Sequence, residues 1–562
     1  MELEKYIDAP KPLEKSFYRY VPLILITFCF CLFANSLTNT FVNYDDWWFV
    51  HNPEMLSWLT PEGLWKTFFD FSYEVRMEHG AQYVPITDLF ASIQYRLFRE
   101  NSFPYHLVQT GMYAVSGILF FQLLAALGLS FQASLLSTLF FIVHPIHVES
   151  VAWLSSHKDL LSLVFFLACL LSYCKQVMYL ALLFFVLGIG SKYQVLLAPL
   201  FFPFVDRCLG RPVSLKKYLP FFIISVASYL VVNHVAEVVR FLFLDPGKNI
   251  SGLLRNVFGL FDTSLKQLVT PLGLQIYYPF EPSQSWMDVS VLRGMIEFMS
   301  LLLLTVWGYK KKPPFALASV LMIFMFFPML RSREEHLVAD RYLLFSSIGY
   351  CMLLGLGISL FPRKWAGGLT LLLVVGGSFL TVRQNRVWAS SVALWENAAR
   401  GRTPVQRKVW ENLAVVYRDA KEWKKSREYF EYLIKTSNLK DPLLASHWID
   451  LGYVLIQLEE FNGAQDSLLQ ALKLDSNSPK AHLNLGVALA MQGRRKEAKE
   501  SMYKAKALEP SNPEIYFNLA RMEAEEKNYN KVRDHLVILK KLAPLDFRTK
   551  LLEKITDRKT SK

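Results

Sequence analysis

The sequence predicts an all-α protein in which a polytopic helical membrane domain of about 11 spans is followed by an α-solenoid of tetratricopeptide repeats. Two observations predict this class. The chain has 562 residues, of which 52 % are hydrophobic and 15 % aromatic, and long apolar runs recur through its first two thirds. From about residue 408 the pattern changes to a repeat of about 34 residues, which is the period of tetratricopeptide units.

The predicted membrane spans follow from the apolar runs, because a helix of about 20 apolar residues is long enough to cross the hydrocarbon core. Residues 252–274 are amphipathic instead, and they predict a helix lying in the membrane interface. The short runs on either side of 188–192 are also compatible with a broken or re-entrant span. The predicted spans are 20–39, 105–127, 132–150, 158–175, 177–190, 193–206, 218–239, 290–308, 314–331, 340–361 and 365–382.

Positive charge predicts the orientation of these spans, because Lys and Arg collect in cytoplasmic loops. Lys5, Lys11, Lys15 and Arg19 precede the first span, and they predict that residues 1–18 are a cytoplasmic N-terminal segment. Alternation of the spans then places the first outer loop, residues 40–104, and the C-terminal tail on the periplasmic, luminal or extracellular side. The basic residues of the membrane domain predicted inside are Lys175, Arg207, Arg211, Lys216, Lys217, Lys310, Lys311, Lys312, Arg363 and Lys364.

The repeats predict a second domain, at 383–562, after a membrane domain at 19–382. Gly452 and Gly486 occupy the same position in successive repeats, where a small residue lets paired helices pack closely. Such arrays form binding surfaces rather than catalytic sites, so an exported protein is an expected partner.

The formal net charge of +13 raises the question of nucleic acid binding. The basic residues are spread over short loops and the repeats, and no compact basic and aromatic patch occurs. Much of the charge is explained by membrane topology. Membrane lipids are therefore expected surroundings, and nucleic acid is not an expected partner.

An acidic pair, Asp45–Asp46, follows the first apolar run and is surrounded by aromatic residues in Asn-Tyr-Asp-Asp-Trp-Trp. Carboxylates beside a hydrocarbon boundary are costly and mark functional sites. This combination favours chemistry on a lipid-carried substrate at the membrane surface. The alternative is a solvated loop with two ordinary aspartates.

Further polar and ionisable residues fall on the same predicted outer side, which predicts a single site there. A transferase using a polyprenyl-phosphate sugar needs a carboxylate to take the proton from the acceptor hydroxyl. It also needs Lys or Arg to stabilise the departing phosphate. Asp45 and Asp46 are the predicted catalytic residues, and the predicted substrate-binding residues are His144, His147, Glu149, His157, Lys158, Asp159, Lys192, Asp340, Arg341 and Tyr342.

Each of these groups also has a structural interpretation. The histidine-rich stretch could bind a divalent metal, although its spacing is not a standard zinc motif, or it could form helix-end hydrogen bonds. Asp340 and Arg341 could form an ion pair at a helix end. Lys192 could extend along apolar surface toward the interface. No cofactor is predicted, and metal is the less favoured alternative.

Five segments together resemble the transmembrane-and-tetratricopeptide-repeat O-mannosyltransferases of the GT-C superfamily. The segments that carry the resemblance are Phe-Val-Asn-Tyr-Asp-Asp (41–46), Pro-Tyr-His-Leu-Val (104–108), Val-His-Pro-Ile-His-Val-Glu-Ser-Val-Ala-Trp (143–153), Lys-Asp-Leu-Leu-Ser (158–162) and Ala-Asp-Arg-Tyr-Leu (339–343). The resemblance implies a GT-C fold, a polyprenyl-phosphate sugar donor and a Ser/Thr acceptor on protein. It also implies that Asp45 is the base, with Asp46 beside it.

The chain departs from the family pattern at three places, where Val84, His157 and Tyr193 replace the usual Arg, Arg and Glu. The identity of the sugar is therefore left open, with mannose expected from the family. The function predicted is an inverting membrane glycosyltransferase that modifies exported proteins. The alternatives are a GT-C enzyme that glycosylates a glycan or lipid, and a non-enzymatic membrane scaffold whose repeats recruit partners.

Overall fold

The computed structural model describes residues 19–46, 53–238, 250–278, 282–324, 338–401, 407–438, 440–544 and 546–560. Helices are the only regular elements in these ranges, which confirms the predicted all-α class. The chain divides into two compact units, Met1–Thr403 and Pro404–Lys562. This division lies after Thr403, whereas the sequence pattern placed it after residue 382, inside a continuous helix.

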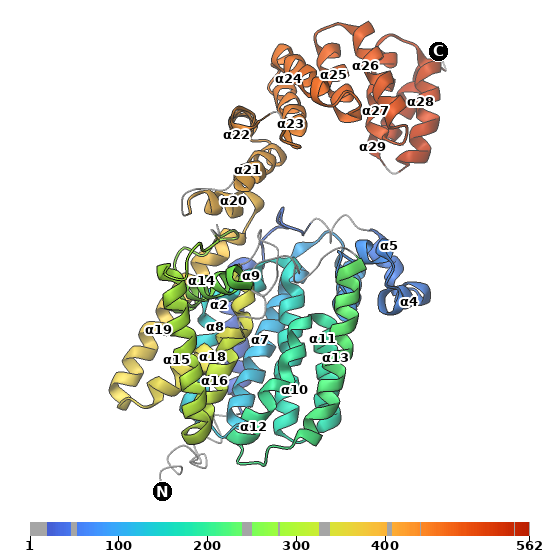
Figure 1. Cartoon of the computed structure of the whole chain (residues 1–562). Helices are drawn as coiled ribbons and strands as arrows, with labels where there is room; N and C mark the ends of the chain where they lie inside the picture. Colours follow the sequence, from blue (N-terminus) through green and yellow to red (C-terminus); the bar gives the residue numbers. More distant parts are fainter. Residues whose placement is uncertain are drawn as a thin grey trace. The chain divides into compact units, whose positions relative to one another are not determined.

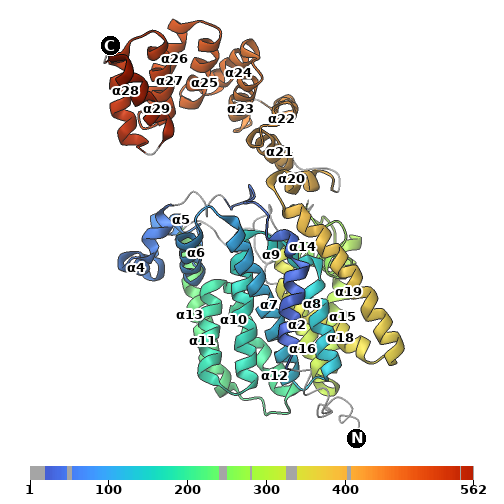
Figure 2. The same cartoon turned by 180° about the vertical axis from the view of Figure 1, so that it is seen from behind.

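The first unit is a bundle of apolar helices that coincide with the predicted runs (Figures 1 and 2). They begin as the sequence favours, for example with Pro313 in the first turn of α16 and Ser130 accepting a backbone hydrogen bond at the start of α8. The helices are α2 (Val21–Leu32), α7 (Ser102–Ala126), α8 (Phe131–Val143), α10 (His157–Cys174), α11 (Met178–Ser191), α12 (Phe202–Cys208), α13 (Leu215–Val238), α15 (Val289–Lys311), α16 (Pro313–Ile323), α18 (Leu344–Ser359) and α19 (Arg363–Asn385).

Within the described residues, six helices are long and apolar enough to cross a membrane, or up to seven if a bent pair counts as one span. The bent pair is Phe131–Val143 with Pro145–Ala152, which meet at 51°. Three further predicted spans appear as shorter apolar helices, α2, α11 and α16. A multi-pass membrane protein is thus indicated, but the predicted count of eleven spans is not reproduced.

Close helix packing in the bundle depends on small residues at crossing points. A Cβ added to Gly355 of α18 would lie 2.1 Å from Ser137 Oγ and 2.7 Å from Ser137 N in α8. The backbone of Gly355 therefore lies directly against Ser137. A larger residue at position 355 would push α18 and α8 apart.

The polar connections of the bundle gather at its two ends. At one end, Arg207 Nε donates to the carbonyl of Tyr309 at 2.9 Å, and Arg211 donates to the carbonyl of Cys174 at 2.8 Å. Basic loops that are distant in sequence are thereby brought together. At the opposite end lie the short helices α4 (Pro61–Phe69), α5 (Tyr73–Glu78) and α9 (Val148–Ala152), together with the longer α14 (Ile250–Val269) (Figure 1).

The predicted first outer loop is itself folded. It contains η3 (Pro53–Leu59), α4, α5 and α6 (Pro85–Phe98), and η3 packs on α6 around Met55, Trp58, Ala91 and Tyr95. Thr60 caps α4 by accepting a hydrogen bond from Gly63 N at 3.1 Å. This small apolar core gives the loop a defined position over the bundle.

The second unit consists of paired helices, and its largest core cluster includes residues from Ala414 to Met522. A Cβ added to Gly486 would meet Met502 Cγ at 2.5 Å, which explains why the repeat needs a small residue there. Pro479 and Pro513 begin their helices, as expected for this residue in a first helical turn. The helices are α21 (Arg407–Asp419), α22 (Trp423–Thr436), α23 (Leu444–Gln457), α24 (Phe461–Leu474), α25 (Pro479–Met491), α26 (Arg495–Leu508), α27 (Pro513–Glu525), α28 (Tyr529–Leu542) and α29 (Phe547–Thr560).

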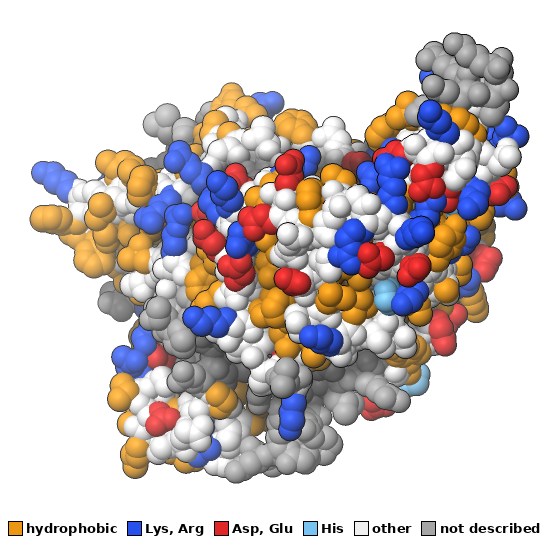
Figure 3. All heavy atoms as spheres, turned by 90° about the horizontal axis from the view of Figure 1, so that it is seen from above, with side chains coloured by type: hydrophobic (Ala, Val, Ile, Leu, Met, Phe, Trp, Pro, Cys, Tyr) orange, Lys and Arg blue, Asp and Glu red, His pale blue; other side chains and the backbone are white. Residues whose placement is uncertain are grey.

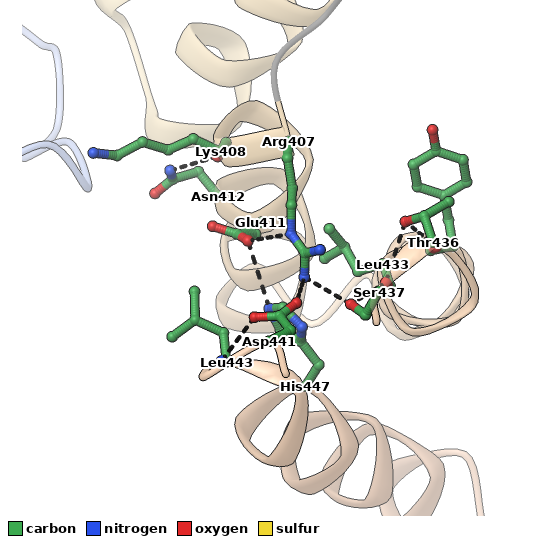
Figure 4. Close-up of polar contacts among 11 residues, drawn as sticks. Arg407, Lys408, Glu411, Asn412, Leu433, Thr436, Ser437, Asp441, Leu443 and His447 are labelled. Carbon is green, nitrogen blue, oxygen red and sulfur yellow. Dashed lines mark hydrogen bonds and ion pairs between the residues drawn. The ribbon is translucent and has the colours of Figure 1, made fainter. Parts of the chain in front are cut away.

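Ion pairs connect successive repeats as well. Figure 4 shows Arg407 held between Glu411 of its own helix and Asp441, with Ser437 Oγ also accepting from it at 2.7 Å. Further along the array, the carboxylate of Asp450 accepts hydrogen bonds from basic side chains of two different repeats. On the face seen in Figure 3, acidic and basic side chains are interspersed rather than segregated.

Candidate functional site

The site begins with the two adjacent aspartates, which the structure treats differently. Asp46 is buried, and its carboxylate accepts hydrogen bonds from Val42 N at 3.0 Å, Ser155 N at 3.0 Å and Ser155 Oγ at 2.7 Å. Asp45 is exposed and has a backbone φ of 72°, which is uncommon for a residue with a side chain. This strained backbone at Asp45 directs the two side chains into different environments, one exposed and one buried.

Aromatic side chains from distant segments hold this turn in place. Trp153 Nε1 donates to the carbonyl of Tyr44 at 2.7 Å, and the two rings are 4.8 Å apart. On the other side, Trp395 of α20 (Ser391–Ala399) donates to the carbonyl of Asn43 at 3.2 Å. The turn that carries Asp45 is therefore fixed between α9 and α20 rather than free in solvent.

The electrostatics of the turn follow from this burial. Desolvation raises the pKa of Asp46 to about 7, against the opposing effect of the hydrogen bonds from Val42 and Ser155. Desolvation likewise raises the pKa of Tyr44 to about 12. Asp46 is therefore buried and bonded within the turn, whereas the neighbouring Asp45 is exposed.

Asp45 lies at the edge of a cavity of about 250 Å³ between the folded first loop and the start of α10. Two other predicted residues, His157 and Lys158, line the same cavity. Lys158 Nζ lies 3.4 Å from Gln82 Oε1. The lining residues are Asp45, His79, Gly80, Gln82, Val84, Thr87, Asp88, Trp153, Ser155, His157 and Lys158.

Two ion pairs flank this region. Arg341 of η8 (Asp340–Leu343) pairs with Glu149 of α9, which also accepts from Arg341 N at 3.1 Å. The guanidinium lies over the rings of Trp153, at 5.0 Å, and Tyr342, at 4.8 Å. The predicted Arg341 is thus brought to the site, but as the partner of a carboxylate.

The second ion pair joins Lys192 to Asp159, and Ser156 Oγ donates to the same carboxylate at 2.9 Å. Lys192 is only 6 % exposed, and its ammonium lies 5.7 Å from the centre of the Tyr342 ring. The snorkelling interpretation of Lys192 is therefore wrong, because its charge is buried and paired.

Asp340 and Arg341 have separate partners, and the structural ion pair at this helix start is formed by Arg341 with Glu149. Asp340 accepts a hydrogen bond from Tyr278 OH at 2.5 Å, and that hydroxyl accepts from Gln275 N at 2.9 Å. Asp340 therefore joins η8 to the segment after α14. Arg341 turns the other way, toward Glu149.

His144 and His147 do not line the cavity and instead stabilise the backbone. His144 Nδ1 accepts from Ile146 N at 3.2 Å, and its Nε2 donates to the carbonyl of Leu268 at 2.9 Å. His147 is fully buried between Tyr113 OH, at 2.6 Å, and Ser347 Oγ, at 2.7 Å. The helix-end interpretation describes these two histidines better than substrate binding does.

The metal interpretation of this stretch has no geometric support. In the part of the chain that the structure describes, no group of three His, Cys, Asp or Glu side chains is arranged to hold a metal ion. His144, His147 and His157 each turn to a different partner, with His157 Nδ1 donating to the carbonyl of Leu154 at 3.0 Å.

Sequence reasoning missed a pair in the same cavity. His79 Nδ1 lies 2.9 Å from Asp88 Oδ2, and both side chains are buried. In the sequence, a histidine and an aspartate nine positions apart in a loop rich in aromatic residues are only a weak indication of a hydrogen-bonded pair. Only the fold of the first outer loop, which brings the end of α5 to the start of α6, makes them neighbours.

Comparison with known proteins agrees with this architecture. Residues 452–493 match the family described as TPR repeat, and residues 479–512 match Tetratricopeptide repeat. The chain is 24 % identical over 517 residues to Protein O-mannosyl-transferase TMTC3 of Mus musculus, covering 81 % of this chain and 55 % of that protein. It is 23 % identical over 447 residues to TMTC3 of Homo sapiens, covering 70 % of this chain and 48 % of that protein.

Among solved structures, YrrB, a TPR protein with an unusual peptide-binding site, matches 29 % of this chain and 82 % of that chain, at 20 % identity and a TM-score of 0.24.

The membrane-length helices followed by repeats define a multi-pass membrane protein with a C-terminal tetratricopeptide region. The chain is a distant homologue, at about 24 % identity over most of its length, of the TMTC protein O-mannosyl-transferases. The predicted resemblance is confirmed. The chain spans about half the length of the curated relatives that it matches.

Proposed function

We propose that this protein is a membrane glycosyltransferase of GT-C fold that transfers a sugar, expected to be mannose, from a polyprenyl-phosphate donor to Ser/Thr hydroxyls of exported proteins. One observation carries the proposal. An accessible carboxylate, Asp45, shares a cavity with the ammonium of Lys158 at one end of a bundle of membrane-length helices. Homology to protein O-mannosyl-transferases supports the sugar and the acceptor class.

Asp45 is the general base in this proposal. Its carboxylate takes the proton of the acceptor hydroxyl as the oxygen attacks C1 of the sugar, and the bond between C1 and the phosphate oxygen breaks with inversion. Phosphate is already a good leaving group, so the reaction does not require the second carboxylic acid that glycoside hydrolysis uses. Asp46 keeps the turn rigid through Val42 and Ser155.

Lys158 is the cation that best fits the departing phosphate. Arg341 and Lys192 are each neutralised by a buried carboxylate, Glu149 and Asp159 respectively. No such pairing holds Lys158, since among the described residues no carboxylate lies within 4.0 Å of its ammonium. An unpaired cation in a partly dry cavity is well suited to stabilise negative charge that develops on a leaving group.

The arrangement of the bundle also supports an orientation. The cavity lies at the end opposite the basic connections around Arg207 and Arg211, and basic loops favour the cytoplasm. We therefore propose that the cavity faces the periplasm, lumen or exterior, with the N-terminus cytoplasmic. An odd number of spans, eleven in this proposal, would place the repeats on the same side as the cavity, where they could engage the acceptor protein.

Substitution of Asp45 tests the proposal. Asp45→Asn keeps the shape of the side chain and removes the proton acceptor, so the rate of transfer should fall by about 10²–10⁴-fold. The measurement is mass spectrometry of a serine- and threonine-containing peptide incubated with the purified full-length protein and a polyprenyl-phosphate mannose.

Asp70→Asn is the matched control, because Asp70 belongs to the same outer loop but does not line the cavity. It should retain activity. Wild-type turnover by the Asp45→Asn protein would reject the assignment. Transfer to a glycan or lipid but not to peptide would redirect the proposal to the other acceptor class, and no transfer at all would favour a scaffold.

A further inference from the structure

The buried pair His79–Asp88 lies in the cavity that holds Asp45 but has no part in the mechanism given above. His79 follows α5 and stacks on Trp58, with ring centroids 4.0 Å apart and an interplanar angle of 18°. Asp88 lies in the first turn of α6. Two separate elements therefore fix the imidazole, one by stacking and one by a hydrogen bond.

The hydrogen bond to Asp88 determines what the other ring nitrogen can do. A carboxylate accepts from an imidazole N–H, so Nδ1 carries a proton, and in the neutral ring Nε2 presents a lone pair. Among the described residues, Nε2 has no hydrogen-bond partner. The ring is held with an acceptor nitrogen available in a cavity that also contains Asp45 and Lys158.

A sugar-transfer site must bind hydroxyl groups, and a neutral imidazole nitrogen is a good acceptor for them. We propose that His79 is a substrate-binding residue whose Nε2 accepts a hydrogen bond from a hydroxyl of the molecule bound in this cavity. Asp88 is a positioning residue that holds the imidazole in the required tautomer. This inference rests on the proposed function and adds a specificity-determining contact to it.

The hydroxyl can come from the donor sugar or from the acceptor Ser/Thr, and one set of measurements separates the two. We would determine KM and, by direct titration, Kd for a polyprenyl-phosphate mannose and for a serine- and threonine-containing peptide, using full-length protein. His79→Ala should raise KM and Kd by about 3- to 10-fold for whichever substrate supplies the hydroxyl, as expected for one lost hydrogen bond. The values for the other substrate should not change.

Two further variants separate binding from a structural role. His79→Gln retains an acceptor oxygen near the position of Nε2 and should recover part of the lost affinity. Asp88→Asn removes the carboxylate that sets the tautomer, so it should shift the same constants as His79→Ala, in the same direction. In both variants, KM and Kd should change only for the substrate that supplies the hydroxyl.

Tyr83→Phe is the matched control, because it deletes the hydrogen bond from Tyr83 OH to the carbonyl of Phe68 in the same loop, outside the cavity lining. It should lower the melting temperature without changing KM or Kd. If the His79 variants behave like Tyr83→Phe, the pair is structural and the inference is wrong. A wild-type protein that shows no transfer would reject the proposed function, while the Kd values would still decide the role of His79.

Discussion

Asp45 and Asp46 are adjacent and chemically identical, but the fold gives their side chains different surroundings. Asp46 accepts three hydrogen bonds in a dry pocket, two of them from Ser155, which lies 109 positions further along the chain. Asp45, at a positive φ, faces the cavity instead. The sequence motif draws attention to both residues, but only the fold shows that their environments differ.

Burial of Asp46 predicts a pH dependence of stability. Its pKa is raised from 3.8 to about 7 by folding, so the native state binds more protons than the unfolded state between these values. The contribution of Asp46 to stability is thus fully present below pH 4 and is lost as the pH rises toward 7. The loss would be at most about 4 kcal/mol, from about 1.4 kcal/mol per pH unit.

This prediction is checked by comparing melting temperatures of wild-type and Asp46→Asn protein between pH 4 and pH 8. The wild-type protein should lose more stability than the variant between pH 4 and pH 7, and the two curves should run parallel above pH 8. Equal slopes throughout would show that Asp46 does not titrate in this window.

At the scale of elements, the described ion pairs act as connectors between helices. Glu149–Arg341 joins α9 to η8, and Lys192–Asp159 joins the end of α11 to the start of α10. Buried pairs of this kind cost desolvation when they form and are expensive to break singly. Arg341 and Lys192, two of the predicted substrate-binding residues, are thus engaged by protein carboxylates.

The repeats allow a test of packing between helices. A Cβ on Gly452 would lie 2.5 Å from Leu468 Cγ, so Gly452→Ala should overpack the α23–α24 contact and destabilise it by about 1–3 kcal/mol. At Gly463, in α24, the nearest atom would be 3.5 Å away, an ordinary contact. Gly463→Ala should therefore be neutral or stabilise the helix by up to about 1 kcal/mol.

Hydrogen exchange of α23 and α24 in the full-length protein measures both effects in the same repeat. Protection should fall in Gly452→Ala and be kept or increased in Gly463→Ala. Equal changes in the two variants would contradict the packing argument.

At the scale of the molecule, the division after Thr403 separates the cavity from the repeats. If the repeats recruit acceptor proteins, as proposed, they act by raising the local concentration of acceptor near the site. A protein that ends at Thr403 should then modify a short peptide at the wild-type rate but whole protein acceptors about 10-fold more slowly. Mass spectrometry of both acceptors measures this, with the melting temperature of the truncated protein as control.

A truncated protein that modifies both acceptors normally would show that the repeats are dispensable for recruitment. One that loses activity on the short peptide as well would show that the repeats support the catalytic unit itself.

The sequence by itself determined the class of this protein, because its signals are local. Apolar runs of membrane length became helices, the repeat period located the paired helices of the tail, and the motif around Asp45 predicted a site at one end of the bundle. The helices and the repeats depend on neighbouring residues and on periodicity, which require no knowledge of tertiary contacts.

The partner of each polar side chain was decided only by the tertiary structure. Arg341 meets Glu149 across 192 positions, and His147 meets Ser347 across 200, so neither pairing has a local signal. The His79–Asp88 pair likewise depends on the fold of the first outer loop, which brings the end of α5 to the start of α6. Burial favours these pairings strongly, because leaving a buried polar group without a hydrogen-bond partner costs more free energy than local conformational preferences contribute.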